Sequence, residues 1–293
     1  MPEYGSPTVR RRRLAAELRR LREHADLTGE DVAEQLGWSA SKVSRIELYR
    51  TGVKTADLTR LLDLYGVTGT HQTELLALAT EPRRKGWWEA YSDALPEEYS
   101  AYIVLEAEAE SVECWSPQLV HGLLQTTDYA RAVIEAHMGS TVGLPPGKIR
   151  QRVQTRIERQ QVITGERQLP LSVVLDQSVL LRRVGDERIM RQQLEHLIEI
   201  SKRPNVRIQV LPLTGSHPIG TGAFALLHFA PVPGISQSTD VVYIEQLGRT
   251  ALYVEDEDEV FDYRLALTRT TERSLSPDDT RELIAKVARE DWS

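Results

Sequence analysis

Residues 38–47, WSASKVSRIE, bring hydroxyl and basic side chains together at helical spacing. Lys42 and Arg45 carry donors that can bind the edge of a guanine, and such a pair is worth about 1–3 kcal/mol of base discrimination. Serine pairs with several bases and specifies little. Val43 and Ile46, three residues apart, fall on another arc of the same helix. The segment fits a helix that reads DNA, but a solvated amphipathic helix has the same pattern, so the flanking sequence must decide.

The flanks have the spacing of a helix-turn-helix. When residues 29–48 are numbered as twenty positions, Ala33 is fifth and Gly37 is ninth. A small residue lets two helices cross closely, and glycine suits the short turn between them. Val43 and Ile46, at positions fifteen and eighteen, would seat the second helix on the first. Two unrelated helices would have the small residue, the glycine and the two apolar residues at these four positions only by chance. The spacing therefore favours the helix-turn-helix.

Capping residues mark the boundaries of these helices. Thr28 followed by Asp31 is an acidic variant of the capping box and predicts the start of the first helix. Gly37 is expected to end it in the left-handed conformation. Ser39 is expected to cap the second helix. Further helices are expected near residues 9–25, 55–65 and 71–79.

The second helix of such a motif lies in the major groove, and its N-terminal residues contact base edges. We therefore expect base contacts from residues 39–47, whereas Thr28 and Arg50 are expected to hold phosphates, which position a protein without specifying sequence. The predicted DNA-binding residues are Thr28, Ser39, Ala40, Ser41, Lys42, Ser44, Arg45 and Arg50. The basic block at residues 10–13 is either an arm along the DNA backbone or a solvated helix start.

The segment TGEDVAEQLGWSASKVSRIELYRTG, residues 28–52, resembles the XRE-type, lambda-repressor-like domain. That resemblance implies an all-α N-terminal domain of five short helices that binds double-stranded DNA. Because one helix-turn-helix reads only half of a palindromic operator, a homodimer is expected.

Charge separates this module from the rest of the chain. Residues 1–85 hold 15 Lys and Arg against 12 Asp and Glu, a formal charge of +3, whereas residues 86–293 hold 21 against 31, a charge of −10. The length of 293 residues also suggests about two domains. We expect a DNA-binding domain at 1–80, a linker at 81–90 and a sensor, partner-binding and dimerisation domain at 91–293.

The chain has no apolar run of the roughly 18 residues that a membrane span needs. Its one cysteine, Cys114, cannot form an intrachain disulfide, which fits a reducing compartment. These features predict a cytoplasmic protein.

The second half predicts an α+β or α/β domain with about five strands. Short β-branched runs bounded by Pro, Gly and Asn are typical of strands, and they occupy residues 171–175, 206–211, 223–229, 241–247 and 250–255. A helix at 186–201 between the first two strands favours a parallel pair, and residues 247–250 are expected to form a hairpin turn. Helices are also expected at 102–115, 128–138, 148–162, 257–271 and 277–289.

Charged helices in this half are expected to present solvated faces. The helix at 102–115 carries Glu106, Glu108, Glu110 and Glu113, and the helix at 148–162 carries Arg150, Arg152, Arg156 and Arg159. An anion-binding role for the four arginines is the alternative.

No ordered catalytic motif occurs in the second half. His196, His217 and His228 with Glu245 could gather around a metal, but histidines near strands are more often structural. Cys114 is expected to be a buried, inert thiol. Trp87, Trp88 and Trp115 suit a core better than a ligand pocket. We therefore expect no enzyme, metal or cofactor.

The second half also resembles proteins of one group, through WWEAYSDALPEEY, LVHGLLQTTDYARAV, VGDERIMRQQLEHL and VRIQVLPL. The group is the actinobacterial XRE-type regulators that have a C-terminal domain of uncharacterised function. The resemblance implies a transcription regulator, often paired with a small protein from a neighbouring gene. Three functions compete: a regulator that senses a partner or ligand, an antitoxin-like protein that neutralises a small partner, and an enzyme targeted to DNA.

Overall fold

The computed structural model describes residues 7–48, 51–80, 97–139, 145–214, 220, 222–231, 234–235, 240–245 and 251–292. The chain forms two compact units, one of residues 1–86 with 229–239 and the other of residues 87–228 with 240–293. From the sequence, residues 229–239 are expected to belong to the C-terminal domain at 91–293. Arg50, the linker at 81–90 and the hairpin turn at 247–250 lie outside the described residues.

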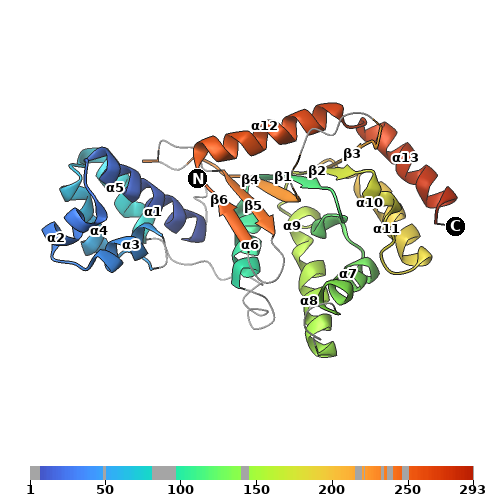
Figure 1. Ribbon diagram of the computed structural model, residues 1–293, viewed down its shortest axis with the longest axis horizontal. Helices are drawn as coiled ribbons and strands as arrows, with labels where there is room; N and C mark the ends of the chain where they lie inside the picture. Colours follow the sequence, from blue (N-terminus) through green and yellow to red (C-terminus); the bar gives the residue numbers. More distant parts are fainter. Residues whose placement is uncertain are drawn as a thin grey trace. The chain divides into compact units, whose positions relative to one another are not determined.

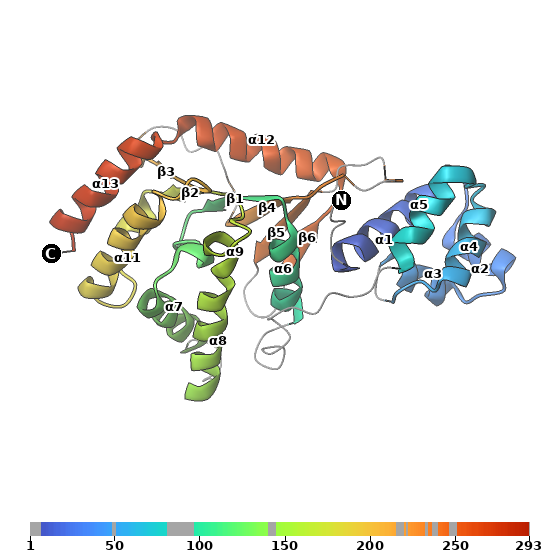
Figure 2. The same ribbon diagram turned by 180° about the vertical axis from the view of Figure 1, so that it is seen from behind.

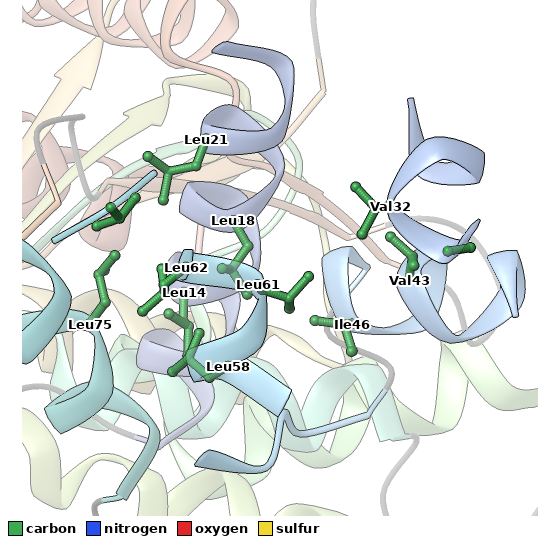
Figure 3. Packing of buried hydrophobic residues seen from close by; sticks show 12 residues of the cluster. Leu14, Leu18, Leu21, Val32, Val43, Ile46, Leu58, Leu61, Leu62 and Leu75 are labelled. Atoms are coloured by element: carbon green, nitrogen blue, oxygen red, sulfur yellow. The ribbon is translucent and has the colours of Figure 1, made fainter. Parts of the chain in front are cut away.

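The first unit contains the five predicted helices (Figure 1). They are α1 (Pro7–His24), α2 (Gly29–Leu36), α3 (Ala40–Glu47), α4 (Thr55–Leu64) and α5 (Gly69–Thr80). Each contributes a side chain to one core, and Leu18, Val32, Val43, Leu62 and Leu75 are all at most 2% exposed (Figure 3). Full burial of such a side chain stabilises a fold by about 1.5–3 kcal/mol. The apolar stripe read from the sequence is therefore the seam that joins the five helices.

The second unit is built on a six-stranded mixed sheet in the order β3-β2-β1-β4-β5-β6. Its strands are β1 (Ser111–Ser116), β2 (Leu171–Asp176), β3 (Val206–Leu211), β4 (Phe224–His228), β5 (Val241–Glu245) and β6 (Ala251–Val254). The first three strands pair in parallel, as expected for β2 and β3, and the last three extend the sheet with antiparallel pairs. The sheet with its helices thus confirms the predicted α+β or α/β class, and it has one strand more than the sequence predicted.

That additional strand is β1, where the sequence analysis predicted a continuous helix. The helix α6 covers Glu97–Glu108 only, and Ser111–Ser116 is extended at the centre of the sheet. Its backbone groups pair with β2 on one side and β4 on the other. Strand propensity depends strongly on cross-strand context. Pairing on both edges therefore outweighs the acidic pattern that suggested a helix.

The remaining helices cover the two faces of the sheet. They are α7 (Thr127–Gly139), α8 (Pro146–Arg159), α9 (Gln161–Thr164), α10 (Ser178–Leu181), α11 (Glu187–Ile200), α12 (Glu257–Arg273) and α13 (Pro277–Glu290), with a short 3-10 helix at Gly122–Leu124. Figures 1 and 2 show α12 along one face and α6, α7 and α8 on the other. On the α12 side, Trp115 is fully buried in the core, as expected.

Glu106 and Arg159, which were predicted to lie on solvated helix faces, form a buried ion pair instead. Glu106 is 0% exposed and Arg159 is 3% exposed. Arg159 donates from Nε to Glu106 Oε1 at 2.7 Å and from Nη2 to Oε2 at 2.9 Å. It also donates to the hydroxyl of Tyr99 at 2.5 Å. Burial lowers the pKa of Arg159, but Glu106 and Tyr99 outweigh it and hold the pKa above its ordinary value. The predictions were wrong for these residues because the two charges face each other from separate helices.

Removing one member of this pair should strongly destabilise the second unit. Breaking a buried pair leaves an uncompensated charge, and we expect Arg159→Met to lower the free energy of unfolding by about 3–5 kcal/mol. Urea denaturation measures it. The double variant Glu106→Leu/Arg159→Met should recover much of the loss. The matched control is Arg188→Met, whose pair with Asp128 is exposed and should be worth less than about 1 kcal/mol. A double variant as unstable as the single one would contradict this account.

Candidate nucleic-acid interface

The predicted start of the first motif helix is confirmed. Thr28 is the N-cap of α2 and forms a reciprocal capping box with Asp31. The Asp31 N–H donates to Thr28 Oγ1 at 3.1 Å, and the Thr28 N–H donates to Asp31 Oδ2 at 2.7 Å. Hydrogen bonds from Thr28 hold the pKa of the Asp31 carboxyl below its ordinary value. The Thr28 hydroxyl also donates to Asp31 Oδ2, so its first role is structural.

The turn between α2 and α3 has the predicted left-handed glycine. Gly37 has φ of 65° and ψ of 36°. The Trp38 N–H donates to the Ala33 carbonyl at 2.7 Å, and the Gly37 N–H donates to the Glu34 carbonyl at 3.2 Å. These two bonds are those of a Schellman motif, which satisfies carbonyls at the end of a helix. The turn therefore fixes where α2 ends and in which direction the chain leaves it.

The helix α3 buries one face and exposes another. Val43 and Ile46 are 2% and 5% exposed and belong to the core of the unit. Ser39 caps the helix by accepting from the Lys42 N–H at 3.3 Å, as predicted. The exposed predicted site residues on and beside α3 are Ser39, Ala40, Ser41, Ser44 and Arg45. The structure thus leaves these five accessible, with Ser39 at the start of α3 and the other four along the helix.

The two basic side chains of α3 differ in their surroundings. Lys42 Nζ lies 2.9 Å from Asp57 Oδ2 and 3.6 Å from the centre of the Trp38 ring. Arg45 is exposed and, within the described part of the chain, has no ion-pair or hydrogen-bond partner for its guanidinium. Arg45 is therefore the side chain of α3 whose donors remain available for a ligand, whereas Lys42 also helps to hold α3 beside α4.

Sequence reasoning missed the ion pair that fixes the end of α3. Arg22 on α1 donates from Nε to Glu47 Oε1 at 2.7 Å and from Nη2 to Oε2 at 3.1 Å. The same guanidinium donates from Nη1 to the Leu27 carbonyl at 2.8 Å. A separation of 25 residues leaves no local signal for such a pair in the sequence. The pair fastens the last residue of α3 to α1.

The first unit also includes a segment from the second half of the chain. Arg13 donates from Nη1 to the Ala230 carbonyl at 3.1 Å, and His71 Nε2 lies 2.8 Å from the Gly234 carbonyl oxygen. Ile235 packs against the core of the unit. Arg12 and Arg13 are 4% and 7% exposed. For these two arginines the structure supports neither a backbone arm nor a solvated helix start.

The second unit contains a charged cluster around His228. His228 Nδ1 lies 2.8 Å from Asp240 Oδ2, and its Nε2 lies 3.4 Å from Glu113 Oε2. Arg264 on α12 donates to Asp240 Oδ2 at 2.6 Å. The hydrogen bonds to Asp240 and Glu113 raise the pKa of His228 to about 9. His228 is therefore a cation at neutral pH, held between two carboxylates.

The metal constellation considered from the sequence has no counterpart in the described residues. Among them, no group of three His, Cys, Asp or Glu side chains has the geometry to hold a metal ion. His217 lies outside the described residues. Cys114 is buried on β1, not on a helix, and burial raises the pKa of its thiol above the ordinary value. The thiol is buried, as expected.

Comparison with known families assigns both halves of the chain. Residues 13–75 match the model of a helix-turn-helix domain, and residues 99–286 match the model of a domain of unknown function, DUF5753. A helix-turn-helix domain indicates a DNA-binding regulator rather than an enzyme. No curated protein and no solved structure matches the chain. In the described residues, no helix is both long enough and apolar enough to cross a bilayer.

The left-handed backbone of Gly37 predicts that replacing this glycine lowers the stability of the first unit. A Cβ added there meets nothing within 4 Å, so only its φ of +65° opposes a substitution. We expect Gly37→Ala to lower the free energy of unfolding of the first unit by about 1–2 kcal/mol, with a smaller loss for Gly37→Asn. Gly147→Ala is the matched control, because Gly147 has the same open space without the positive φ. Thermal denaturation measures the stability of these variants. A Gly37→Ala variant more stable than Gly37→Asn would contradict a left-handed backbone at this position.

The His228 cluster predicts a pH-dependent stability. The pKa of His228 is raised above its ordinary value on folding, so its contribution is complete below about pH 6.5 and is lost as the pH rises through about 9. Between those values we expect wild type to lose about 1–2 kcal/mol more than His228→Gln, after allowance for solvent screening. Urea denaturation at both pH values measures the difference. Parallel pH profiles for the two proteins would rule out a charged His228.

Proposed function

Because this chain belongs to the DUF5753 family and carries a helix-turn-helix domain, we propose that it is a sequence-specific DNA-binding regulator of transcription. The observation that carries the proposal is the exposed face of α3. Ala40, Ser41, Ser44 and Arg45 are exposed there. On the other face, Val43 and Ile46 are buried in the core and hold the helix in place. A helix held in this way can place its N-terminal side chains against base edges in the major groove.

The residues divide between reading and positioning. Arg45 is the proposed base reader, because its guanidinium can bind guanine through two donors. Ser39, Ser41 and Ser44 would add contacts of low specificity, while Thr28 and Arg50 would hold phosphates. Lys42 would contribute positive charge to the face, although its Nζ is already near Asp57.

We also propose that the regulator is a cytoplasmic homodimer on a palindromic operator. A single helix-turn-helix reads one half-site, so twofold symmetry in the protein matches twofold symmetry in the DNA. The second half of the chain, with its charge of −10, would not itself be attracted to DNA. It is the proposed site of dimerisation and of binding to a partner or ligand.

The alternative function is that of an antitoxin-like protein. In that case the second half neutralises a small protein encoded nearby, as the resemblance to the actinobacterial group suggests, and DNA binding serves autoregulation. The observation that favours it is the acidic charge of that half, which suits a basic partner. A tight one-to-one complex with the product of the neighbouring gene would support it.

The proposal predicts a specific loss of DNA affinity in Arg45→Ala. Removal of one bidentate base contact costs about 1–3 kcal/mol, so binding to the protein's own promoter should weaken by about 5- to 150-fold. Binding to scrambled DNA should fall much less. Fluorescence anisotropy with a salt titration measures both, because phosphate contacts dominate the salt dependence.

Two variants complete this test. Arg183→Ala removes an equal charge from an exposed side chain of the second unit and should bind the promoter like wild type. Lys42→Ala should weaken binding and also reduce stability, because it loses Asp57 and the Trp38 ring. Unchanged promoter binding by a folded Arg45→Ala would refute α3 as the recognition helix.

A further inference from the structure

The second unit has a small pocket between α12 and the sheet. Its volume is about 150 Å³. Glu113, Ser172 and Arg207, on β1, β2 and β3, lie opposite one another in register and form a polar row along it. Val174 and Leu267 supply apolar surface. The pocket therefore has one apolar wall and a polar row in which Ser172 lies between the two charged residues.

The size of the pocket limits the ligand. An engineered protein cavity of about 150 Å³ holds benzene, which has about six non-hydrogen atoms. A drug-sized molecule or a nucleotide needs a pocket of at least about 300 Å³. A ligand that fits here is therefore a molecule of three or four carbons with its oxygen atoms.

The two ends of the row differ in how their charges are balanced. Glu113 belongs to the cluster with His228, Asp240 and Arg264, which pairs two carboxylates with two cations. Arg207 is exposed on the edge strand β3 and donates from Nε to the amide oxygen of Gln209 at 2.8 Å. Within the described residues, its Nη groups have no carboxylate partner, and the Ser172 hydroxyl has no hydrogen bond. The charge at the pocket that lacks a carboxylate partner is therefore the exposed guanidinium of Arg207.

We propose that this pocket binds a small hydroxycarboxylate. The ligand carboxylate would pair with the Nη groups of Arg207, since guanidinium matches a carboxylate in a two-pronged geometry. Its hydroxyl would bond to Ser172 or to the carboxylate of Glu113, and its carbon atoms would contact Val174 and Leu267. Phosphate fits less well, because it would bring further negative charge toward the apolar wall and Glu113.

Calorimetry on the full chain tests the binding site. L-lactate has six non-hydrogen atoms and is the first probe, with D-lactate as the second enantiomer. We expect one of them to bind with a Kd below about 5 mM, and lactamide, which has nearly the same shape without the charge, to bind at least tenfold more weakly. Arg207→Gln should also weaken lactate at least tenfold. Arg183→Gln, an exposed arginine outside the pocket, should leave the Kd unchanged.

Several outcomes would overturn the assignment. Absence of heat with either lactate at 20 mM would refute the site, and equal binding of lactamide would refute the role of Arg207. Tighter binding of L-alanine would replace the hydroxyl with an ammonium group and refute the ligand class.

Discussion

The orientation of α3 depends on one short connection, the left-handed turn at Gly37. The turn directs the chain out of α2, and Val43 and Ile46 then pack into the core on the other side. If the turn opened differently, α3 could not place these two side chains in the same core. Burial is worth about 1.5–3 kcal/mol for each. The exposed face of α3 is thus a consequence of where its apolar face must go.

Polar contacts make that orientation specific. The Arg22–Glu47 pair holds the end of α3 to α1, and Lys42 joins α3 to Asp57 on α4. Hydrophobic burial is not directional, whereas these bonds have defined geometry. A recognition helix needs such precision, since its side chains must meet base edges within hydrogen-bonding distance.

The second unit places charge inside a protein core. The Glu106–Arg159 pair is buried behind the sheet, and the His228 cluster is partly buried beside α12. Removing charges from water is costly, and each is tolerated because its partners satisfy it. Around His228 two carboxylates and two cations balance. The exposed Arg207 nearby has no carboxylate partner among the described residues. The unit is therefore acidic as a whole but carries one cation without an ion-pair partner at its small pocket.

Local sequence determined the helix-turn-helix. Thr28 with Asp31, Gly37 and Ser39 act within three or four residues of their partners, and the apolar spacing of a helix needs no knowledge of the rest of the fold. The parallel pairing of β2 and β3 could also be predicted, because the helix between them limits the connection.

Only the tertiary structure decided the features that join distant residues. β1 is a strand because β2 and β4 pair with its two edges. Glu106 and Arg159 are buried because they face each other. Ala230 and Gly234 join the first unit because Arg13 on α1 and His71 on α5 bind them. Such partners are separated by tens to hundreds of residues, and no periodicity in the sequence encodes their distance in space.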